Sequence, residues 1–384
     1  MKTHLKSLLY MFVVGVLFWL FLPEKYTINV PFQFTNSLNE QEMVERLTVA
    51  EGYSISIYAD QIDGVRAIIS TDTGDIIASR PNSGKLVLIL NDANNDGRSD
   101  GNKLLLKGLN KPHGIALHEG WLYIAETNAV LRIQYNAKQR KFIGTPHYII
   151  QDSFPGGGNH WSRSVKIGPD NNLYVSIGSS CNVCIEASTK RASILQYDLD
   201  GKNERLFASG LRNTVGFDWS PVTQRLFGVD NGRDFLGENL PFEELNHIIK
   251  GHHYGWPFTH DDKLHDPDFF AQKPPPLITD SPVHKFIAHS APLSLMFLRH
   301  APQTALVTLH GSWNRSKKSG YKVVSLTFSS NNHIHENDFI SGFERNGSVI
   351  GRPVDLTQDK QGNIYLSDDY SGKIYKINPR ENAN

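Results

Sequence analysis

The chain has 384 residues, of which 39% are hydrophobic and 20% are charged, and it carries 39 Lys and Arg against 39 Asp and Glu. This composition fits a globular protein of one large or two ordinary domains and excludes a disordered chain. The zero net charge excludes a global basic field for nucleic acid, so any anion site has to be a local cluster.

The first 23 residues predict a targeting segment. A basic start precedes an apolar run from Leu8 to Leu22, which Pro23 ends. The run is short for a membrane helix of about 20 residues, but no small-residue cleavage pattern follows it. We therefore expect residues 1–23 to be a signal anchor, with a cleaved signal peptide as the alternative. Either segment exports the rest of the chain to the periplasmic or extracellular side, with the membrane contacted only through this segment.

The remainder divides into two expected parts. Residues 24–50 read as a linker with a short helix near 38–47, and residues 51–384 as a single domain. That domain opens with a strand at 53–58, in which apolar and polar residues alternate.

One pattern then recurs six times: a short apolar strand, a turn rich in Asp, Asn and Gly, and a second strand of LYV type. The copies lie at 65–79, 114–126, 164–178, 215–230, 293–309 and 353–368. A period of about 50 residues with three or four short strands is typical of a β-propeller blade. We therefore predict an all-β, six-bladed β-propeller whose strand at 53–58 pairs into the last blade and closes the ring. A β-sandwich explains the strands but not the period.

The longest spacing separates the fourth and fifth copies and holds an insertion rich in aromatic residues and proline, residues 251–276. Long insertions in compact folds are usually lids or binding loops. We expect an ordered one between blades four and five.

The residues just before the first strand of each blade are expected to meet at one mouth of the central channel. In this chain they are His113, His160, Arg163, Arg212, Asn213 and Arg352. A neutral histidine can act as a general base, and guanidinium groups bind carboxylates bidentately. The repeat register therefore predicts a pocket for a planar, multiply anionic ligand.

The two cysteines, Cys181 and Cys184, are spaced C-x-x-C in a loop after a strand. Two thiols alone do not make a closed zinc site, and an exported protein favours a local disulfide.

Two segments are rich in carboxylates. Residues 92–101 match the first part of an EF-hand loop, but Lys103 replaces the glutamate of the twelfth position. A Ca²⁺ site and an Asx-turn loop both remain open there. The segment 230–246, beside the predicted pocket, indicates ion pairing or a metal.

Six segments, in this order, resemble the sugar dehydrogenases that depend on pyrroloquinoline quinone (PQQ). The segments are NHWSRSVKIGPDNNLYVSIGS (159–179), FASGLRNTVGFDWSP (207–221), DNGRDFLGENLPFEELN (230–246), HHYGWP (252–257), LHGSWNRSKKSGYKVV (309–324) and GRPVDLTQDKQGNIYLSDD (351–369). The resemblance is to the sorbosone dehydrogenase-like branch and to soluble quinoprotein glucose dehydrogenase.

This resemblance implies PQQ and Ca²⁺ as cofactors, and hydride transfer from an aldose-type sugar or a related polyol or aldehyde. An external acceptor then takes the electrons. By position, His160 is implied as the base and Arg212 as the residue that polarises a quinone carbonyl. The carbonyls of Gly232 and Arg233 are implied as Ca²⁺ ligands. The residues expected around PQQ, from the resemblance or the register, are Asn213, Arg163, His113, Arg315 and Arg352.

The chain departs from the glucose dehydrogenase branch at three positions. Ser179 or Ser180 stands where that branch has an aspartate that orients the histidine, and Val354 stands where it has a second arginine. The lysine that contacts the cofactor in that branch has no clear match here, and Arg315 and Lys322 are the nearest cationic candidates.

Two other classes share the expected architecture. A Ca²⁺-dependent lactonase or esterase needs Glu, Asn and Asp side chains at the axis, where this chain carries His and Arg. A non-enzymatic propeller that binds protein or glycan at the cell surface explains the anchor but not the pocket.

Overall fold

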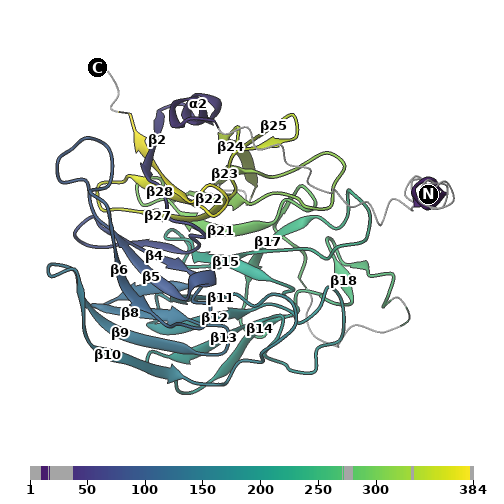
Figure 1. Cartoon of the computed structure of the whole chain (residues 1–384). Coiled ribbons are helices and arrows are strands. Elements are labelled where there is room, and N and C mark those ends of the chain that lie inside the picture. The colour runs from purple at the N-terminus through teal and green to yellow at the C-terminus, as the bar shows by residue number, and fades with distance from the viewer. Residues whose placement is uncertain are drawn as a thin grey trace, which may run out of the picture.

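The computed structural model describes residues 10–15, 17, 38–269, 271, 280–329 and 333–380. The predicted six blades are confirmed, and together they form a closed ring (Figure 1). The predicted signal anchor lies largely outside the described residues. Among those that are described, no helix has the length and apolar character to cross a bilayer.

Each blade is an antiparallel sheet whose strands run in order from the channel to the rim. Blades one to three are β3 (Ile68–Ser70), β4 (Ile76–Arg80), β5 (Lys85–Ile89), β6 (Asn102–Lys107); β7 (Ile115–His118), β8 (Trp121–Ala125), β9 (Val130–Asn136), β10 (Lys141–Ile150); and β11 (Arg163–Ile167), β12 (Asn172–Ile177), β13 (Ser193–Asp198), β14 (Arg205–Ser209). Blades four to six are β15 (Thr214–Trp219), β16 (Leu226–Asp230), β17 (Glu243–Ile248), β20 (His284–Phe286); β21 (Pro292–Phe297), β22 (Thr304–Leu309), β23 (Lys322–Phe328), β24 (Ile334–Ser341); and β27 (Pro353–Gln358), β28 (Ile364–Asp368), β29 (Lys373–Pro379), β2 (Tyr53–Ala59).

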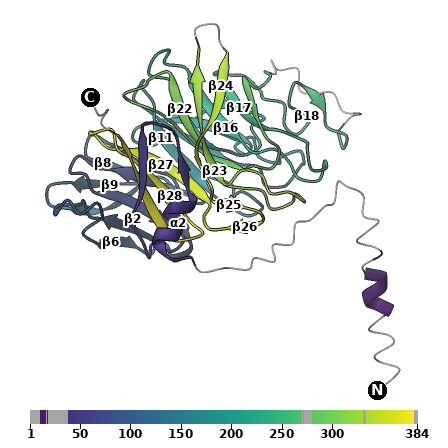
Figure 2. The ribbon, with the colours of Figure 1, turned by 90° about the horizontal axis from the view of Figure 1, so that it is seen from above.

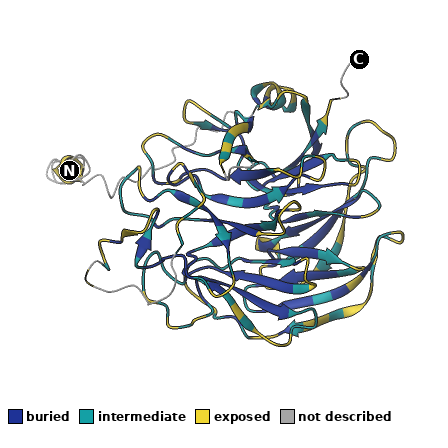
Figure 3. Ribbon diagram, turned by 180° about the vertical axis from the view of Figure 1, so that it is seen from behind, coloured by how far each residue is buried: buried dark blue, intermediate teal, exposed yellow. Residues whose placement is uncertain are grey.

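The second strand of each blade is buried almost throughout, for example in β12 and β22. Neighbouring blades cover both of its faces, which explains why the LYV-type runs are continuously apolar rather than alternating. Figure 3 shows the buried residues gathered in the strands and the exposed ones in the loops and outer strands. The core is therefore a ring of layers between blades.

An N-terminal strap closes the ring. As predicted, β2 pairs with β29 of the last blade. In addition, β1 (Thr48–Val49) pairs with β24, so the strap joins blades five and six. The expected helix is α2 (Glu40–Arg46), which begins at an Asn39–Glu42 capping box. Figures 1 and 2 show α2 between β2 and the hairpin of β25 (Glu344–Arg345) and β26 (Ser348–Val349).

The insertion lies inside blade four, between its third and fourth strands, and not between blades four and five as predicted. The prediction was wrong because the outermost strand of blade four, β20, follows the insertion and has only three residues, so the sequence pattern does not reveal it. The insertion carries a small hairpin of β18 (Thr259–His260) and β19 (Leu264–His265).

The closure gives a stability prediction. Ile57 of β2 is 5% exposed and packs in the core shared by the strap and the last blades. We expect Ile57→Ala to lower the free energy of unfolding by about 2–4 kcal/mol, because it leaves a cavity there. Ser54→Ala on the same strand is the control and should cost less than about 0.5 kcal/mol. Urea unfolding followed by tryptophan fluorescence measures both, and equal stabilities of the two variants would contradict closure by β2.

Candidate active site

The sheet register brings the predicted segments to one mouth of the channel. In blades three to six, the start of the first strand pairs with the end of the second: Arg163 with Ile177, Thr214 with Asp230, Pro292 with Leu309, and Pro353 with Asp368. The residues before the first strand therefore lie beside the residues after the second. Contacts between blades follow, such as Asn314 Nδ2 donating to Asp234 Oδ1 at 2.9 Å.

His160 lies on the loop before β11 with a φ of +47°, which is uncommon for a residue with a side chain. Its Nδ1 is 3.0 Å from the carbonyl oxygen of Ser179 and 2.9 Å from Ser179 Oγ. A carbonyl oxygen only accepts, so Nδ1 carries the proton and Nε2 keeps its lone pair. Burial, and next the charge of Arg212, lowers the pKa of His160 to about 3. The neutral ring, which can accept a proton, therefore persists well below the ordinary pKa.

Ser179, and not Ser180, orients this imidazole. Ser179 Oγ donates to the carbonyl of Cys181 at 2.7 Å, so its lone pairs remain for the Nδ1 proton. Ser180 instead binds Glu186: the N–H of Ser180 donates to that carboxylate at 2.6 Å, and the Ser180 hydroxyl donates to it at 2.8 Å. A serine hydroxyl and a carbonyl thus stand where the resemblance predicts a carboxylate.

Ser179→Ala tests this orientation. The carbonyl of residue 179 would still accept from Nδ1, so we expect kcat to fall only about 5–10-fold, as for the loss of one hydrogen bond. Ser180→Ala is the matched control and should leave kcat unchanged. Steady-state rates of the two variants decide, and a larger loss in Ser180→Ala would reverse the assignment.

Arg212, on the loop before β15, is buried, and within the described part of the chain its guanidinium hydrogen-bonds only to neutral oxygens. Nε donates to the carbonyl of Asn182 at 2.9 Å, Nη2 to Asn182 Oδ1 at 2.9 Å, and Nη1 to the carbonyl of Asn231 at 3.1 Å. Asp230 instead accepts from the backbone N–H groups of Arg212 and Asn213, at 2.9 and 2.8 Å. Burial lowers the pKa of Arg212, and the charges of Asp234, Asp230 and Glu243 offset this in part without a direct ion pair. An anionic ligand could therefore still pair with this buried cation.

Asn213 lies against His160 across Gly178. A Cβ on Gly178 would stand 2.4 Å from Asn213 Oδ1 and 2.6 Å from His160 Cβ. Only glycine permits this approach, so the structure brings His160, Arg212 and Asn213 together, as the register predicts.

Arg163 holds the loop that carries His160. It is fully buried, and it donates to the carbonyls of His160 at 2.8 Å, Ser162 at 2.9 Å and Pro155 at 3.1 Å. Burial, and next the charge of Arg191, lowers its pKa to about 9. The carbonyls take both Nη groups, and only the buried Nε lacks a partner among the described residues, so the contact of Arg163 with a cofactor stays a prediction.

A chain of hydrogen bonds and one ion pair spans the opposite side of the mouth. Arg352 Nη2 lies 2.9 Å from His310 Nδ1, and His310 Nε2 lies 2.9 Å from Asp369 Oδ1. Asp369 also pairs with Arg66 at 2.7 Å. Although burial acts the other way, His310 and Arg66 hold the pKa of Asp369 below its ordinary value. These contacts fix Arg352 at the mouth, where the register places it.

His113 is buried, and neither ring nitrogen has a hydrogen-bond partner of good geometry among the described residues, although the backbone of Arg163 lies near enough to interact with the ring. Burial lowers its pKa to about 3, and Arg66 adds to this. His113 and Arg66 line an axial cavity of about 60 Å³. A buried polar group without a partner indicates a ligand or water in the adjoining space.

The loop after β16 carries the two predicted metal residues. The N–H of Gly232 donates to Glu243 Oε2 at 2.6 Å, and the Arg233 guanidinium pairs with Asp266 and Asp268 of the insertion, both at 2.8 Å. In the described chain, neither carbonyl of this pair accepts a hydrogen bond. A cation could therefore be held there by main-chain oxygens.

Side-chain metal clusters give no alternative. Within the described ranges, the only three His, Cys, Asp or Glu side chains with converging ligand atoms are Cys181, Cys184 and Glu186. The two sulfurs are joined in the predicted disulfide, which is thereby confirmed.

The carboxylates of loop 92–101 hold the loop itself. Asp92 accepts from the N–H groups of Asp96 and Gly97 at 3.0 and 2.9 Å, and Asp100 accepts from that of Ala93 at 3.2 Å. Arg98 of this loop pairs with Glu40 of α2 at 2.8 Å. Such contacts occur both in Asx-turn loops and in Ca²⁺-binding loops, so both alternatives stay open, and the loop also supports the strap.

Arg315 lies closer to the mouth than the other cationic candidate. Its guanidinium donates to Asn239 Oδ1 at 3.1 Å and to the carbonyl of Ala288 at 3.3 Å. Lys322 instead pairs with Asp338 on the outer strand of blade five, at 2.5 Å.

Several residues that build the mouth were missed from the sequence: Asn182, Arg191, His310 and Asn314. His310 and Asn314 lie after a second strand, a position that the repeat register indicates as well as the position before a first strand. Nothing in the local sequence marks Asn182 or Arg191.

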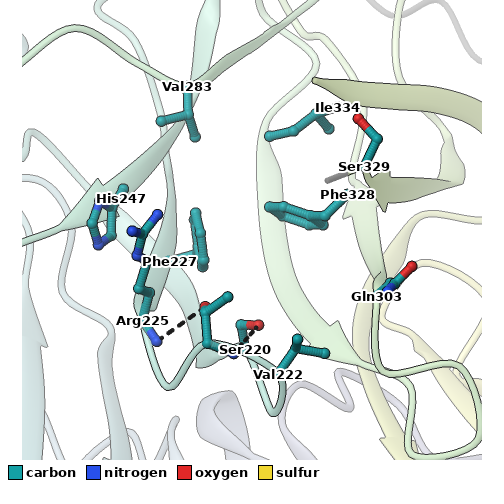
Figure 4. Close-up of a pocket in the computed structure, with 11 residues that line it drawn as sticks. Ser220, Val222, Arg225, Phe227, His247, Val283, Gln303, Phe328, Ser329 and Ile334 are labelled. Carbon is teal, nitrogen blue, oxygen red and sulfur yellow. Dashed lines mark hydrogen bonds between the residues drawn. The ribbon is translucent and has the colours of Figure 1, made fainter. Parts of the chain in front are cut away.

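A larger cavity, of about 430 Å³, opens between blades four and five. Figure 4 shows Phe227, Phe328, Val283 and Ile334 around it, with His247 and Arg225 at one side. The turns at Ser220 and Gln303 place it at the ends of the strands that face away from the mouth. The oriented histidine and the buried arginine lie at the mouth, on the other face of the ring, which makes the mouth the candidate active site.

The class of the protein is therefore that of six-bladed β-propellers with a histidine and arginines at one mouth of the channel. The chain belongs to the TrAA12-like family, whose model matches residues 47–248 and 272–380. It is 30% identical to an uncharacterized protein of Borreliella burgdorferi, over 88% of this chain and 92% of the relative. It is 24% identical to a PQQ-dependent sugar dehydrogenase of Hypocrea jecorina, over 85% of this chain and 88% of the relative.

Solved structures share the fold. The calcium structure of the Trichoderma reesei protein of Carbohydrate-Active Enzymes family AA12 has a TM-score of 0.75 at 22% identity, over 90% of this chain and 99% of that one. The holo form of the pyranose dehydrogenase PQQ domain from Coprinopsis cinerea has a TM-score of 0.71 at 21% identity, over 86% and 96%. The predicted resemblance to PQQ-dependent sugar dehydrogenases is confirmed.

Proposed function

We propose that this chain is a PQQ- and Ca²⁺-dependent dehydrogenase that oxidises a CH–OH group of an aldose-type sugar, or of a related polyol or aldehyde, and passes the electrons to an external acceptor. Family membership and the names of the relatives support the reaction class. We expect the loops around the mouth to determine which sugar binds.

The observation that carries this proposal is the buried guanidinium of Arg212, which hydrogen-bonds only to neutral oxygens of the described chain and lies beside an oriented neutral imidazole. PQQ is a planar tricarboxylate, and a buried guanidinium without a direct carboxylate partner favours such a ligand. The unpartnered ring nitrogens of His113 offer a further polar contact. The residues present therefore fit the cofactor. Arg212, Asn213 and Arg352 would hold it, with His113 and Arg315 around it.

The division of labour follows from the geometry. Bound PQQ supplies a quinone that accepts a hydride from the substrate carbon. The hydroxyl proton must leave as the hydride moves, and Nε2 of His160 is the free acceptor, since Nδ1 is protonated against Ser179. The positive charge of Arg212 would stabilise an oxygen that gains negative charge nearby.

Ca²⁺ would be held by the carbonyl oxygens of Gly232 and Arg233. Hard cations prefer oxygen ligands, including main-chain carbonyls. The ion pairs of Arg233 with Asp266 and Asp268 would keep this loop in place.

We also place the domain on the exported side of the membrane, at the periplasmic or extracellular face, and held there by residues 1–23. The disulfide supports this, because such bonds persist in oxidising compartments.

Reconstitution tests the function. Purified protein with PQQ, Ca²⁺ and an artificial electron acceptor should oxidise aldoses, and omission of either cofactor should abolish the rate. The same preparation should not hydrolyse sugar lactones. Lactone hydrolysis with Ca²⁺ alone, without dye reduction, would favour the lactonase class instead.

A further inference from the structure

Asn182 lies inside the disulfide loop of blade three and contacts two segments of blade four. Its carbonyl and its Oδ1 each accept from the Arg212 guanidinium at 2.9 Å. Oδ1 also accepts from the N–H of Asp234 at 2.8 Å, and Nδ2 donates to the carbonyl of Asp234 at 3.0 Å. The one side chain therefore joins Arg212 to the loop that follows β16.

The disulfide is a covalent restraint on this loop beside the side-chain contacts of Asn182. Within the described chain, no main-chain N–H of residues 181–185 donates to a main-chain carbonyl. The loop has no ladder of its own, and Ile185 at its end is 60% exposed. A covalent bridge between Cys181 and Cys184 limits the conformations open to the two residues between them.

The neighbouring residue of the same loop reaches His160. The carbonyl of Cys181 accepts from Ser179 Oγ at 2.7 Å, and Ser179 in turn contacts His160 Nδ1. Cys181 thus contacts the residue that orients His160, and Asn182 contacts Arg212 itself.

We propose that Asn182 is a positioning residue, which acts through Arg212, and that the Cys181–Cys184 disulfide holds it in place. The inference rests on the proposed function, because its ligand is PQQ. Without the Asn182 side chain, the guanidinium loses the hydrogen bond from Nη2 to Oδ1, whereas the carbonyl of residue 182 can still accept from Nε. The freed end of the guanidinium is less well oriented, so it binds an anionic ligand less well. A residue that served only local stability would not act through Arg212.

A double-mutant cycle on PQQ affinity tests this without any turnover. The Kd for PQQ with Ca²⁺ is measured by absorbance titration for the wild type, Asn182→Ala, Arg212→Ala and the double variant. We expect Asn182→Ala to weaken binding about 10-fold, as for the loss of one hydrogen bond to a charged group. In the Arg212→Ala background the same change should have no effect. Ile185→Ala is the matched control and should bind as the wild type.

The disulfide is tested in the same assay. Cys181→Ser/Cys184→Ser should weaken PQQ binding to the level of Asn182→Ala. If that variant does not fold, the native wild type is reduced and alkylated, the reagents are removed, and PQQ is then titrated. Wild-type affinity in Asn182→Ala, or additive losses in the cycle, would overturn the inference. Failure of the wild type to bind PQQ would instead refute the proposed function.

Discussion

His160→Ala is expected to lower kcat by about 10²–10⁴-fold, the usual cost of removing a general base. PQQ binding should change little, because the groups expected to hold the cofactor are on other loops. The physical reason is the fixed tautomer: Nδ1 is 3.0 Å from the carbonyl of Ser179, which leaves Nε2 as the proton acceptor. Steady-state rates and a PQQ titration on the same preparation measure the two quantities.

His113 and His252 provide the controls. His113 is buried beside the channel, and we expect His113→Ala to raise KM more than it lowers kcat. His252 lies in the insertion and contacts Asp280. If His160→Ala turned over at the wild-type rate with PQQ bound, the base would have to be sought at one of these two residues.

Arg212→Ala is expected to affect both binding and turnover. The loss of charged hydrogen bonds should weaken PQQ binding by about 10–100-fold, and the loss of charge stabilisation should lower kcat by about 10²–10³-fold. Arg225→Ala, at the cavity on the other face of the ring, is the matched control and should change neither.

The same variant has a pH signature. Burial is the larger cause of the low pKa of His160, and the positive charge of Arg212 is the next. Removing that charge should raise the pKa of His160 towards its ordinary value, so the protonated, inactive ring appears at higher pH. The acid limb of kcat/KM should therefore move to higher pH in Arg212→Ala. An unmoved or lower limb would mean that the two residues are not electrostatically coupled.

The architecture could be predicted because it is repetitive. The LYV-type strands are buried on both faces in every blade, so each copy carries the same signal, as β12 and β28 show. The closing strand was found from its alternation, but β1 has two residues and no such signal. The insertion was assigned to the wrong place because β20 is too short to be recognised.

The site could be predicted only in part, since register indicates which loops converge but not which side chains face the ligand. Arg212 and Asn213 meet His160 as expected. Arg163 comes from an equivalent position, yet its guanidinium bonds to the backbone behind the histidine. Asn182 and Arg191 contribute through contacts between loops that are distant in sequence, and no local pattern encodes such contacts.

The central claim is tested most directly by a single turnover without any dye. Protein loaded with PQQ and Ca²⁺ is mixed anaerobically with an aldose, and the absorbance of the bound cofactor is followed. We predict reduction of the cofactor in proportion to the protein, at a rate that depends on the sugar and is lost in His160→Ala. A cofactor that is bound with Ca²⁺ but stays oxidised against a full panel of aldoses, polyols and sugar aldehydes would contradict the account.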